Sequence, residues 1–375
     1  MSDRGSVIVI GGGPAGAVAA GELAARGFAV TVVEAKSFPR AKVCGEFVSP
    51  AAGTILEAFV GGPAGPCAGA ERLTSAGAHR TRAFVLQEGD RSVRWTMPGR
   101  GAWVLSRRAL DVLLLDIARE RGARVLQPER IETVEYTDSG VRVALRSGGV
   151  LEADLVVHAD GSGRFDPAGA TPSRPGVVGL KCHLSHAAGH GPELRMRAAR
   201  GAYIGSVGVE QGGATVALVA RARLLRDARG DRDALLEQLM PAFRPEHRDG
   251  PWLSCGVAAS GYQPPGATRS VRLGNAAAAV EPVGGEGIGL AVWSAAAAAR
   301  LLDETDLSVR GLARFQAEFA RAYRRRLRVR HRACAAAAAV LERPAAVRAM
   351  WPLLERRPGL AVRPFYLATG KLGAA

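Results

Sequence analysis

Cysteine, aromatic residues and long apolar runs are all scarce in this chain of 375 residues. The five cysteines are scattered and have no C-x-x-C spacing, which argues against a disulfide framework and a zinc site. The seven histidines form no cluster with metal-ligand spacing. No apolar run approaches the roughly 20 residues of a membrane-spanning helix, and no secretory signal pattern is visible. These absences favour a protein of the reducing cytoplasm that has no metal centre.

Acidic residues are also in short supply. The chain has 35 Asp and Glu against 50 Lys and Arg, so its formal net charge is +15. Such a charge fits binding to nucleic acid, to an anionic membrane surface or to anionic substrates. It also fits an Arg-rich coding sequence without functional meaning. The alanine runs 276–279, 295–299 and 335–339 point to the same cause, which we favour.

The length and apolar content predict a sizeable core. A chain of 375 residues exceeds the size at which one core usually stops growing, so two intimately joined domains are expected. The apolar share of 47% and the mean hydropathy of +0.04 are typical of globular proteins.

The stretch 7–34 has the pattern of a nucleotide-binding βαβ unit. A β-branched run, Val7–Ile10, predicts a buried parallel strand. Gly11, Gly13 and Gly16 follow in G-x-G-x-x-G spacing and open an Ala-rich, helix-favouring segment. A second apolar run, Val30–Val33, predicts the next strand.

Each part of this unit has a physical role. Gly11 allows a tight turn, Gly13 lets a phosphate approach the backbone, and Gly16 lets the helix pack closely on the sheet. The helix N-terminus then offers N–H groups and a positive dipole end to a pyrophosphate. Glu34, roughly 20 residues on, is placed to accept hydrogen bonds from ribose hydroxyls. The unit predicts that an adenine dinucleotide binds here.

The remaining elements are predicted from periodicity and turn residues. The stretches 83–87, 92–96 and 102–105 alternate and predict an antiparallel sheet distinct from the nucleotide-binding one, whereas 61–69 reads as a Gly/Pro-rich turn region. Helices are predicted over 51–59, 106–121 (capped by Ser106), 232–239, 290–302 and 312–330, with a broken apolar helix from His331 onward. Further strands are predicted over 130–136, 140–146, 154–158, within 177–222, and over 271–273.

Three separated motifs resemble those of one family of flavoproteins. The first is the glycine-rich turn, the second is the A-D-G tripeptide 159–161 after an apolar strand, and the third is the stretch 274–288, GNAAAAVEPVGGEGI. Their order and spacing resemble the FAD-binding family. The similar branch contains para-hydroxybenzoate hydroxylase-type monooxygenases, geranylgeranyl reductases and flavin-dependent halogenases. The resemblance covers essentially the whole chain.

The resemblance implies an α/β fold. A three-layer ββα FAD-binding (Rossmann-like) domain would carry an inserted antiparallel β-sheet substrate domain and C-terminal helices. The expected boundaries are 1–80, 101–170 and 265–330 for the discontinuous FAD-binding domain, 81–100 and 171–264 for the substrate domain, and 331–375 for a C-terminal helical segment.

The resemblance also implies which residues hold FAD. Asp160 would lie near the pyrophosphate, and Arg107 matches a position that often lies against FAD; an arginine on a solvated helix face is the competing interpretation. Residues 284–289 would begin a helix whose N–H groups face the flavin, where negative charge appears on reduction. The expected cofactor contacts are Gly11, Gly13, Pro14, Ala15, Gly16, Glu34, Ala35, Arg40, Cys44, Arg107, Asp160, Gly161, Gly274, Asn275, Gly285, Gly287 and Ile288.

One position departs from the family pattern. Asn275 stands where the family usually has an Asp whose carboxylate bonds a ribityl hydroxyl. Asn keeps an acceptor oxygen of similar shape but loses the charge-assisted bond, a difference of order 1 kcal/mol. FAD binding is expected to survive this change.

The candidate catalytic residues are Cys44, Glu46 and Pro282. In geranylgeranyl reductases a similar Cys-Gly loop lies by the flavin and the substrate double bond, so Cys44 could donate a proton or contact the substrate. The alternative is a buried Cys that packs as a small apolar side chain. Pro282 would shape the approach to the substrate face of the flavin. Arg40 and Lys42 could pair with the phosphates of a nicotinamide donor or with solvent.

Two reactions fit this family, both with NADPH or NADH as reductant. A monooxygenase transfers oxygen to an electron-rich ring, and an ene-reductase delivers hydride and a proton to an alkene. The Cys-Gly loop favours reduction, whereas residues 201–205 lack the Tyr/Trp/Phe-Pro signature of prenyl reductases and residues 95–98 lack the Trp-rich halogenase signature. We therefore favour hydroxylation of an aromatic or polyketide-like molecule in specialised metabolism, with geranylgeranyl-reductase-like alkene reduction as the alternative.

The basic run 321–332, RAYRRRLRVRHR, offers a third interpretation from another class. It could be an arm for nucleic acid or for an anionic membrane. Only Tyr323 offers a stacking face, so a solvated helix face is favoured. The expected partners are a small, aromatic or lipophilic substrate and no nucleic acid, with peripheral membrane contact left open. The chain is expected to be a monomer or a homodimer.

Overall fold

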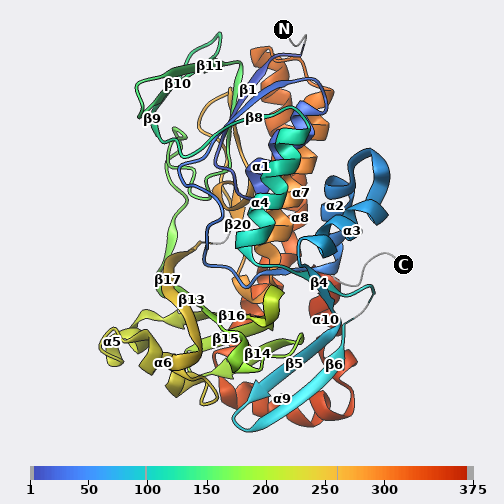
Figure 1. Ribbon diagram of the computed structural model, residues 1–375, viewed down its shortest axis with the longest axis vertical. Helices are drawn as coiled ribbons and strands as arrows, with labels where there is room; N and C mark the ends of the chain where they lie inside the picture. The colour runs from blue at the N-terminus through green and yellow to red at the C-terminus, as the bar shows by residue number, and fades with distance from the viewer. Residues whose placement is uncertain (1–3, 98, 260, 370–375) are drawn as a thin grey trace.

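The computed structural model describes residues 4–97, 99–259 and 261–369, and its elements are built around two large sheets (Figure 1). The first sheet has five parallel strands in the order β19–β12–β1–β2–β8. Its strands are rich in valine and isoleucine, as expected when both faces of a parallel sheet are covered. They are β1 Ser6–Ile10, β2 Ala29–Val33, β8 Arg124–Leu126, β12 Leu155–His158 and β19 Ser270–Arg272.

Different layers cover the two faces of the parallel sheet. Helices α1 (Pro14–Ala24), α4 (Arg107–Glu120) and α7 (Glu286–Asp303) share one large apolar core with one face. On the other face, Ile8 and Ile10 pack against a three-stranded antiparallel sheet. The three strands are β9 Ile131–Tyr136, β10 Val141–Leu145 and β11 Val150–Ala153. This arrangement confirms the predicted three-layer ββα architecture.

The second large sheet has seven strands in the order β17–β13–β16–β15–β14–β5–β6. All its neighbouring strands are antiparallel except β5 and β14. Helices α5 (Ala222–Asp227) and α6 (Arg232–Leu239) lie at its outer side in Figure 1. The strands are β5 Ala83–Glu88, β6 Arg91–Thr96, β13 Ser173–Leu184, β14 Leu194–Ala199, β15 Ala202–Gly208, β16 Ala214–Arg221 and β17 Arg248–Ala258.

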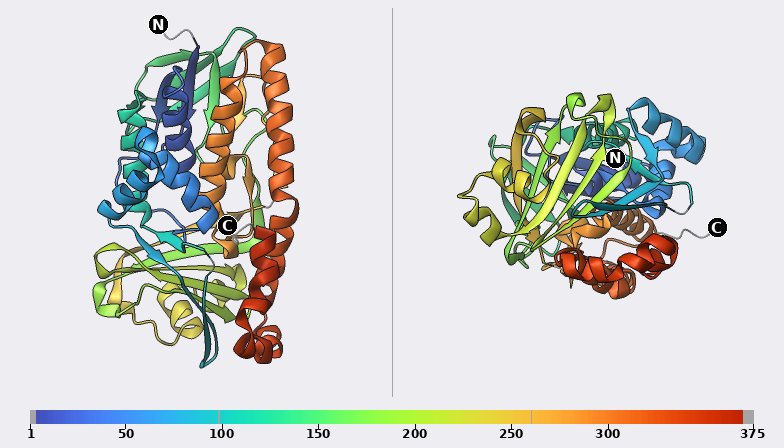
Figure 2. Two further views of the ribbon diagram at one scale, coloured as in Figure 1. Left: turned by 90° about the vertical axis from the view of Figure 1, so that its right-hand side faces the viewer. Right: turned by 90° about the horizontal axis from the view of Figure 1, so that it is seen from below.

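Long helices join the two sheets. Helix α8 (Val309–Leu341) runs along one side of the molecule from the parallel sheet to the seven-stranded sheet (Figure 2, left). Helices α9 (Pro344–Arg356) and α10 (Pro358–Thr369) follow it, and their apolar side chains share a core with the seven-stranded sheet. The smaller elements are β3 Phe47–Val48, α2 Pro50–Gly61, α3 Gly65–Ser75, β4 His79–Thr81, β7 Ala102–Val104, β18 Gly261–Tyr262 and β20 Ala278–Ala279, with short 3-10 turns at 62–64, 186–188, 210–212, 245–247, 274–276 and 282–284.

Several local predictions are confirmed. Helix α4 starts where predicted, and the Ser106 hydroxyl caps it by accepting the N–H of Ala109 at 3.2 Å. Helix α6 spans 232–239 as predicted, and β9 and β10 lie within the predicted strands 130–136 and 140–146 and pair with each other. These elements follow from local periodicity and capping, which the sequence displays directly.

Three local predictions are wrong. The Gly/Pro-rich stretch 61–69 is not simply a turn, because α3 begins at Gly65 with Pro66 at a first-turn position. The strand at 102–104 joins β3 and β4 rather than the sheet of β5 and β6. The helix break predicted at His331 is absent, since α8 continues to Leu341 and ends just before Pro344. Among the described residues, no helix is both long enough and apolar enough to cross a membrane.

Candidate functional site: a cradle and a deep cavity

The turn between β1 and α1 is held by close backbone packing. Gly11 has φ +99°, and a Cβ atom there would lie 2.8 Å from the Ala159 carbonyl oxygen. A Cβ atom on Gly16 would lie 1.8 Å from the Gly11 carbonyl oxygen. The first hydrogen bond of α1 runs from the Ala17 N–H to the Gly13 carbonyl at 2.9 Å, and Pro14 occupies the first turn. The N-terminus of α1 is thereby fixed at the edge of the sheet.

Glu34 ends β2 and ties the turn to the neighbouring loop. One carboxylate oxygen accepts the Gly12 N–H at 2.7 Å and the other accepts the Lys36 N–H at 2.8 Å. A carboxylate has about four acceptor positions, so lone pairs are left for hydroxyl donors. Glu34 lines the cavity described next, where such donors could reach it.

A cavity of about 1240 Å³ begins at this turn and extends to the seven-stranded sheet and the C-terminal helices. It brings together almost all residues that the sequence predicted for the site. Gly16 and Glu46 do not line it: Gly16 packs under the turn, and Glu46 is buried behind the wall. The predicted residues that line the cavity are Gly11, Gly13, Pro14, Ala15, Glu34, Ala35, Arg40, Cys44, Arg107, Asp160, Gly161, Gly274, Asn275, Pro282, Gly285, Gly287 and Ile288.

Three cations line the cavity beside the N-terminus of α1. Guanidinium nitrogens of Arg107 and Arg40 would lie 3.6 and 3.7 Å from a Cβ atom on Gly13, and the Lys42 Nζ would lie 3.2 Å from one on Gly161. Burial and the charges of Arg107 and Arg40 lower the pKa of Lys42. An anion such as a pyrophosphate would relieve this mutual repulsion.

Arg107 is buried rather than solvated, which contradicts the competing interpretation of this residue. Its guanidinium donates to both oxygens of the Asp111 carboxylate, at 2.6 and 2.7 Å. Burial would lower the pKa of Arg107, but the Asp111 charge and hydrogen bonds outweigh it and raise the pKa. The Arg40 guanidinium lies 3.5 Å from the same carboxylate. Asp111 therefore holds both arginines against the cavity wall.

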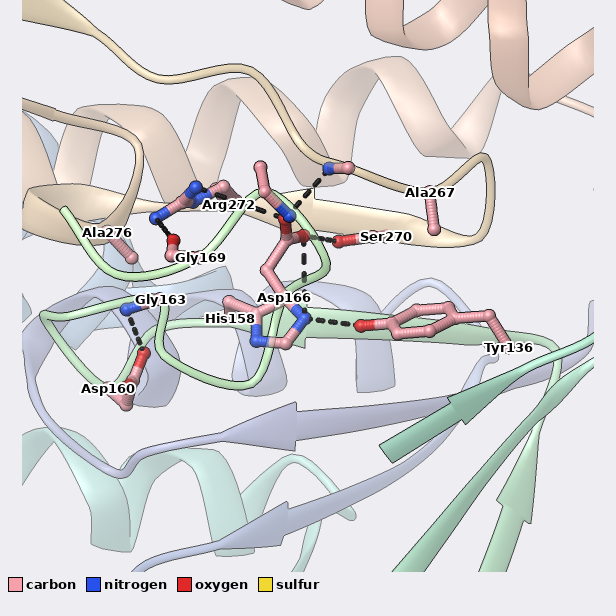
Figure 3. A network of polar contacts seen from close by, with 12 residues as sticks. Tyr136, His158, Asp160, Gly163, Asp166, Gly169, Ala267, Ser270, Arg272 and Ala276 are labelled. Carbon is pink, nitrogen blue, oxygen red and sulfur yellow. Dashed lines mark hydrogen bonds and ion pairs between the residues drawn. The ribbon is translucent and has the colours of Figure 1, made fainter. Parts of the chain in front are cut away.

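The loop after β12 is anchored by a buried polar network (Figure 3). Asp160 accepts the Gly163 N–H at 2.9 Å and so forms its own turn while it also lines the cavity. Farther along the loop, Asp166 accepts the Gly266 N–H at 2.8 Å and the hydroxyl of Ser270 on β19. The loop that carries Asp160 is thus tied to the edge strand of the parallel sheet.

His158 lies under this network and is fully buried. Its Nε2 is hydrogen-bonded to the Tyr136 hydroxyl at 2.7 Å and lies 3.7 Å from the Asp166 carboxylate. Burial lowers the pKa of His158 to about 4, although the charges of Asp166 and Asp160 oppose the shift. His158 is therefore neutral in the folded protein at neutral pH.

We expect the stability of the FAD-loaded protein to fall as the pH is lowered from 6.5 toward 4. In this window the unfolded chain protonates His158 but the folded chain does not, so the unfolded state binds more protons and gains stability. The full effect is up to about 3 kcal/mol of unfolding free energy. Urea unfolding across this pH range measures the slope. His158→Gln, which cannot be protonated, should flatten it; an unchanged slope in that variant would contradict the assignment.

The late glycine-rich segment forms a second helix N-terminus at the cavity. Pro282–Gly284 is a 3-10 turn, Gly285 has φ +62° and caps α7, and Gly287 has open space where a Cβ atom would be. Helix α7 therefore begins where the family resemblance implied a helix start, with its positive dipole end toward the cavity. Asn275 is exposed toward the same cavity.

The segment 42–47 forms the part of the cavity wall beside the N-terminus of α7. Cys44 is partly exposed to the cavity, and its sulfur accepts the Glu46 N–H at 3.3 Å. Phe47 lies against the Gly285 turn, where a Cβ atom on Gly285 would be 2.6 Å from the phenyl ring. The Cys-Gly loop and the N-terminus of α7 are therefore neighbours.

Glu46 is the buried anchor of this loop. Its φ of +56° is rare for a residue other than glycine. Its carboxylate pairs with Lys181 of β13, accepts the Arg107 backbone N–H at 2.8 Å and lies 3.2 Å from the His183 ring. Burial would raise the pKa of Glu46, but the His183 hydrogen bond and the Lys181 charge outweigh it and hold the pKa at about 2. The predicted catalytic residue Glu46 thus fastens the cavity wall instead of facing the cavity.

The far part of the cavity is lined by apolar side chains that the sequence did not indicate. They come from the seven-stranded sheet on one side and from α8, α9 and α10 on the other. Helical periodicity alone could not say which sheet these helices cover. Representative lining residues are Leu86, Met196, Val219, Val257, Val340, Met350, Val362 and Phe365.

Tyr203 is a polar residue of the far cavity wall that the sequence did not indicate. Its hydroxyl donates to the buried Glu281 carboxylate at 2.6 Å, and Arg174 pairs with the same carboxylate. Burial raises the pKa of Tyr203, so the phenol keeps its proton. The sequence offered only the tyrosine in the stretch 201–205 as a signal for this contact. The fold alone brings its partner, Glu281, next to it.

The near part of the cavity fits FAD. Two helix N-termini, three cations and the Glu34 carboxylate converge on it, and Gly13 and Gly287 leave space where side chains would stand. The N-terminus of α1 and the three cations suit a pyrophosphate, and the Glu34 carboxylate suits the hydroxyls of a ribose. The N-terminus of α7 suits an electron-accepting ring.

Comparison with known families agrees with this fit. Residues 4–164 match a family model described as an FAD binding domain. Those residues include β1, α1, β2, α4 and the Asp160 loop. The family match thus covers the first two of the three motifs on which the resemblance was based.

Among curated proteins, a menaquinone reductase of Mycobacterium tuberculosis (strain ATCC 25618 / H37Rv) is similar over most of the chain. It is 28% identical over 336 residues, which span 82% of this chain and 79% of the relative. The similarity reaches well beyond the FAD-binding domain, so it includes segments that line the far part of the cavity.

Solved structures share the fold at low sequence identity. PqsL, a probable FAD-dependent monooxygenase from Pseudomonas aeruginosa, has a TM-score of 0.72 at 21% identity, covering 92% of this chain and 99% of its own. The flavin-dependent brominase Bmp2 has a TM-score of 0.75 at 16% identity, covering 97% and 93%. The predicted resemblance to FAD-binding proteins is confirmed over residues 4–164 by the family match, and these structures show that the fold is shared.

Proposed function

We propose that this chain, a flavoprotein of the superfamily of para-hydroxybenzoate hydroxylase and the flavin-dependent halogenases, reduces a carbon–carbon double bond of an isoprenoid lipid such as a prenylated quinone. The observation that carries the proposal is the apolar extension of the cavity between the seven-stranded sheet and the C-terminal helices. Such a space suits a long hydrocarbon chain better than a small polar aromatic ring. The similarity to menaquinone reductases over 79% of their length supports it. It replaces the hydroxylation favoured from the sequence.

The near part of the cavity would hold FAD in this proposal. The N–H groups at the start of α1, with Arg40, Lys42 and Arg107, would bind the pyrophosphate, and Glu34 would accept ribose hydroxyls. The N-terminus of α7 would face the ring where negative charge develops. Bound FAD, reduced by NADH or NADPH, would supply the hydride.

Cys44 is the group that we assign as proton donor. Hydride addition to one carbon of the double bond leaves the other carbon to take a proton, so an acid must lie in the cavity. Cys44 lines the cavity and carries a thiol, a group that can donate this proton. Tyr203 is a poorer acid because its phenolate would lie beside the Glu281 carboxylate. Tyr203 would instead shape the wall.

Anaerobic turnover tests the proposal. The FAD-loaded protein is reduced with dithionite without oxygen and then mixed with a prenylated quinone, and the products are analysed by mass spectrometry. We expect a product that has gained two carbon-bound hydrogen atoms, both of them deuterium when the reaction is run in D₂O, because dithionite supplies only electrons and the flavin takes its protons from solvent. A reaction that needs oxygen and adds an oxygen atom would overturn the proposal in favour of monooxygenation.

In the same assay, Cys44→Ala is expected to slow product formation by about 100-fold, as is typical for loss of a general acid. Flavin reduction should proceed as before, because that step needs no proton from Cys44. Cys67→Ala is the matched control, since Cys67 is an exposed thiol on α3 outside the cavity. A Cys44→Ala rate equal to that of the control would exclude Cys44 as the donor.

A further inference from the structure

We infer that α9 and α10 dock on an anionic membrane surface and admit lipid to the cavity from the bilayer. Helix α10 carries a single charged residue, Arg363, in twelve residues and is apolar on several sides. Its inner side, with Ala361 and Phe365, lines the cavity, while Leu360 and Leu367 on another side are 50% and 61% exposed. A helix that is apolar on opposite sides normally has apolar surroundings on both.

Exposed apolar side chains are concentrated at these two helices. Seven large apolar side chains are exposed among the described residues, and four of them lie on α9 and α10. The four are Met350, Leu353, Leu360 and Leu367. Figure 2 shows the two helices together at one corner of the molecule, below the long helix α8. An apolar patch of this kind on a monomer marks an interaction surface.

The charge around the patch selects an anionic partner. From Arg343 to Thr369 the chain has five arginines and one glutamate, and four of the arginines are on or between α9 and α10. The basic run 321–332 on α8 reaches α10, where Arg330 donates to the Thr369 carbonyl at 2.7 Å, and the neighbouring Arg328 and Arg332 are exposed. Apolar side chains flanked by arginines are the pattern of a helix lying in a lipid interface.

The structure disfavours nucleic acid as the partner of the basic run. Tyr323, the aromatic residue of that run, is fully buried and packs against Trp293 and Phe319. It therefore cannot stack on a base, which removes the stacking face that single-strand binding requires. The same arginines remain suitable for lipid phosphates.

The cavity reaches this surface. Met350 of α9, Pro364 of α10 and Val329 of α8 line the cavity and are also exposed. The space between these three helices is thus bounded by apolar side chains that contact both the interior and the exterior. A hydrocarbon chain could pass from a bilayer to the cavity without crossing water, which favours transfer of a poorly soluble substrate.

Vesicle co-sedimentation of the FAD-loaded protein tests this inference without any turnover, so its outcome is independent of the reductase proposal. We expect binding to vesicles of phosphatidylcholine mixed with phosphatidylglycerol, and weaker binding to phosphatidylcholine alone. Added salt should weaken the binding without abolishing it, because apolar insertion is not screened.

The triple variant Leu353→Ser, Leu360→Ser and Leu367→Ser is expected to lower vesicle affinity at least about tenfold, because three inserting leucines are lost. Val150→Ser is the matched control, since Val150 is 57% exposed on β11 in the distant three-stranded sheet. FAD content and the thermal melting curve show whether each variant is folded. Folded triple variant that binds as tightly as the control overturns the inference. Wild-type protein that binds to none of the vesicles would overturn it as well. So would light scattering that shows a dimer for the wild type and a monomer for the triple variant.

Discussion

Replacing Gly16 with alanine is expected to produce protein that no longer retains FAD. The new Cβ atom would lie 1.8 Å from the Gly11 carbonyl oxygen, so α1 must move away from β1. Its N-terminal N–H groups then leave the pyrophosphate position. Each hydrogen bond lost to the charged pyrophosphate costs about 1.5–3 kcal/mol, so loss of two of them lowers FAD affinity by at least about 100-fold. Flavin absorbance after gel filtration and titration with FAD measure the effect.

Gly359→Ala is the matched control for this prediction. Gly359 also lies in a helix, but a Cβ atom there has no atom within 4 Å. The control should bind FAD as the wild type does. If Gly16→Ala also purifies with a full complement of FAD, the glycine turn does not position the cofactor as proposed.

Replacing Glu46 with glutamine is expected to lower the unfolding free energy by about 3–5 kcal/mol, because removing one partner of a buried ion pair leaves an uncompensated charge. That charge is the ammonium of Lys181, which is fully buried beside Glu46. The loop that carries Cys44 should loosen as well, since Glu46 also holds the Arg107 backbone. Urea unfolding of the FAD-loaded protein measures the unfolding free energy, and the rate of FAD release measures how firmly the loop is held.

A second substitution separates loss of charge pairing from general damage. Adding Lys181→Met to Glu46→Gln removes the orphan charge and should recover most of the lost stability. If the double variant recovers no stability, the unpaired Lys181 charge is not the cause of the loss. In the wild type, the pKa of Glu46 lies at about 2, below its usual 4.5. Its contribution is therefore complete above pH 4.5 and is lost as the pH falls toward 2.

The sequence predicted the parts of the site that depend on neighbours along the chain. The β1–α1 turn and Glu34 at the end of β2 depend on strand and helix boundaries and on glycines at positions that need them. Because these constraints are local, spacing located them. The start of α7 was placed through the family resemblance. Cys44 and Arg107 were placed at the cavity through the family resemblance.

The rest of the site depends on contacts between distant segments. Glu46 pairs with Lys181, 135 residues away, and Tyr203 donates to Glu281, 78 residues away. The residues next to each of them in the sequence do not indicate the partner. The position of Lys181 between the apolar residues Leu180 and Cys182 was a local signal. To predict the far wall of the cavity, one would have to know that α8 does not break at His331 but continues onto the seven-stranded sheet. Its apolar character then changed the favoured reaction.

The hydrogen bond from the Trp95 indole to the Tyr366 hydroxyl, 3.0 Å long, joins segments 271 residues apart. During synthesis the ribosome therefore delivers the whole seven-stranded sheet before the helices that cover it exist. Until α9 and α10 emerge, the apolar face around Trp95 and Met196 is open to water and to other nascent chains. Newly made protein should consequently depend on chaperones that shield this face until translation has passed α10.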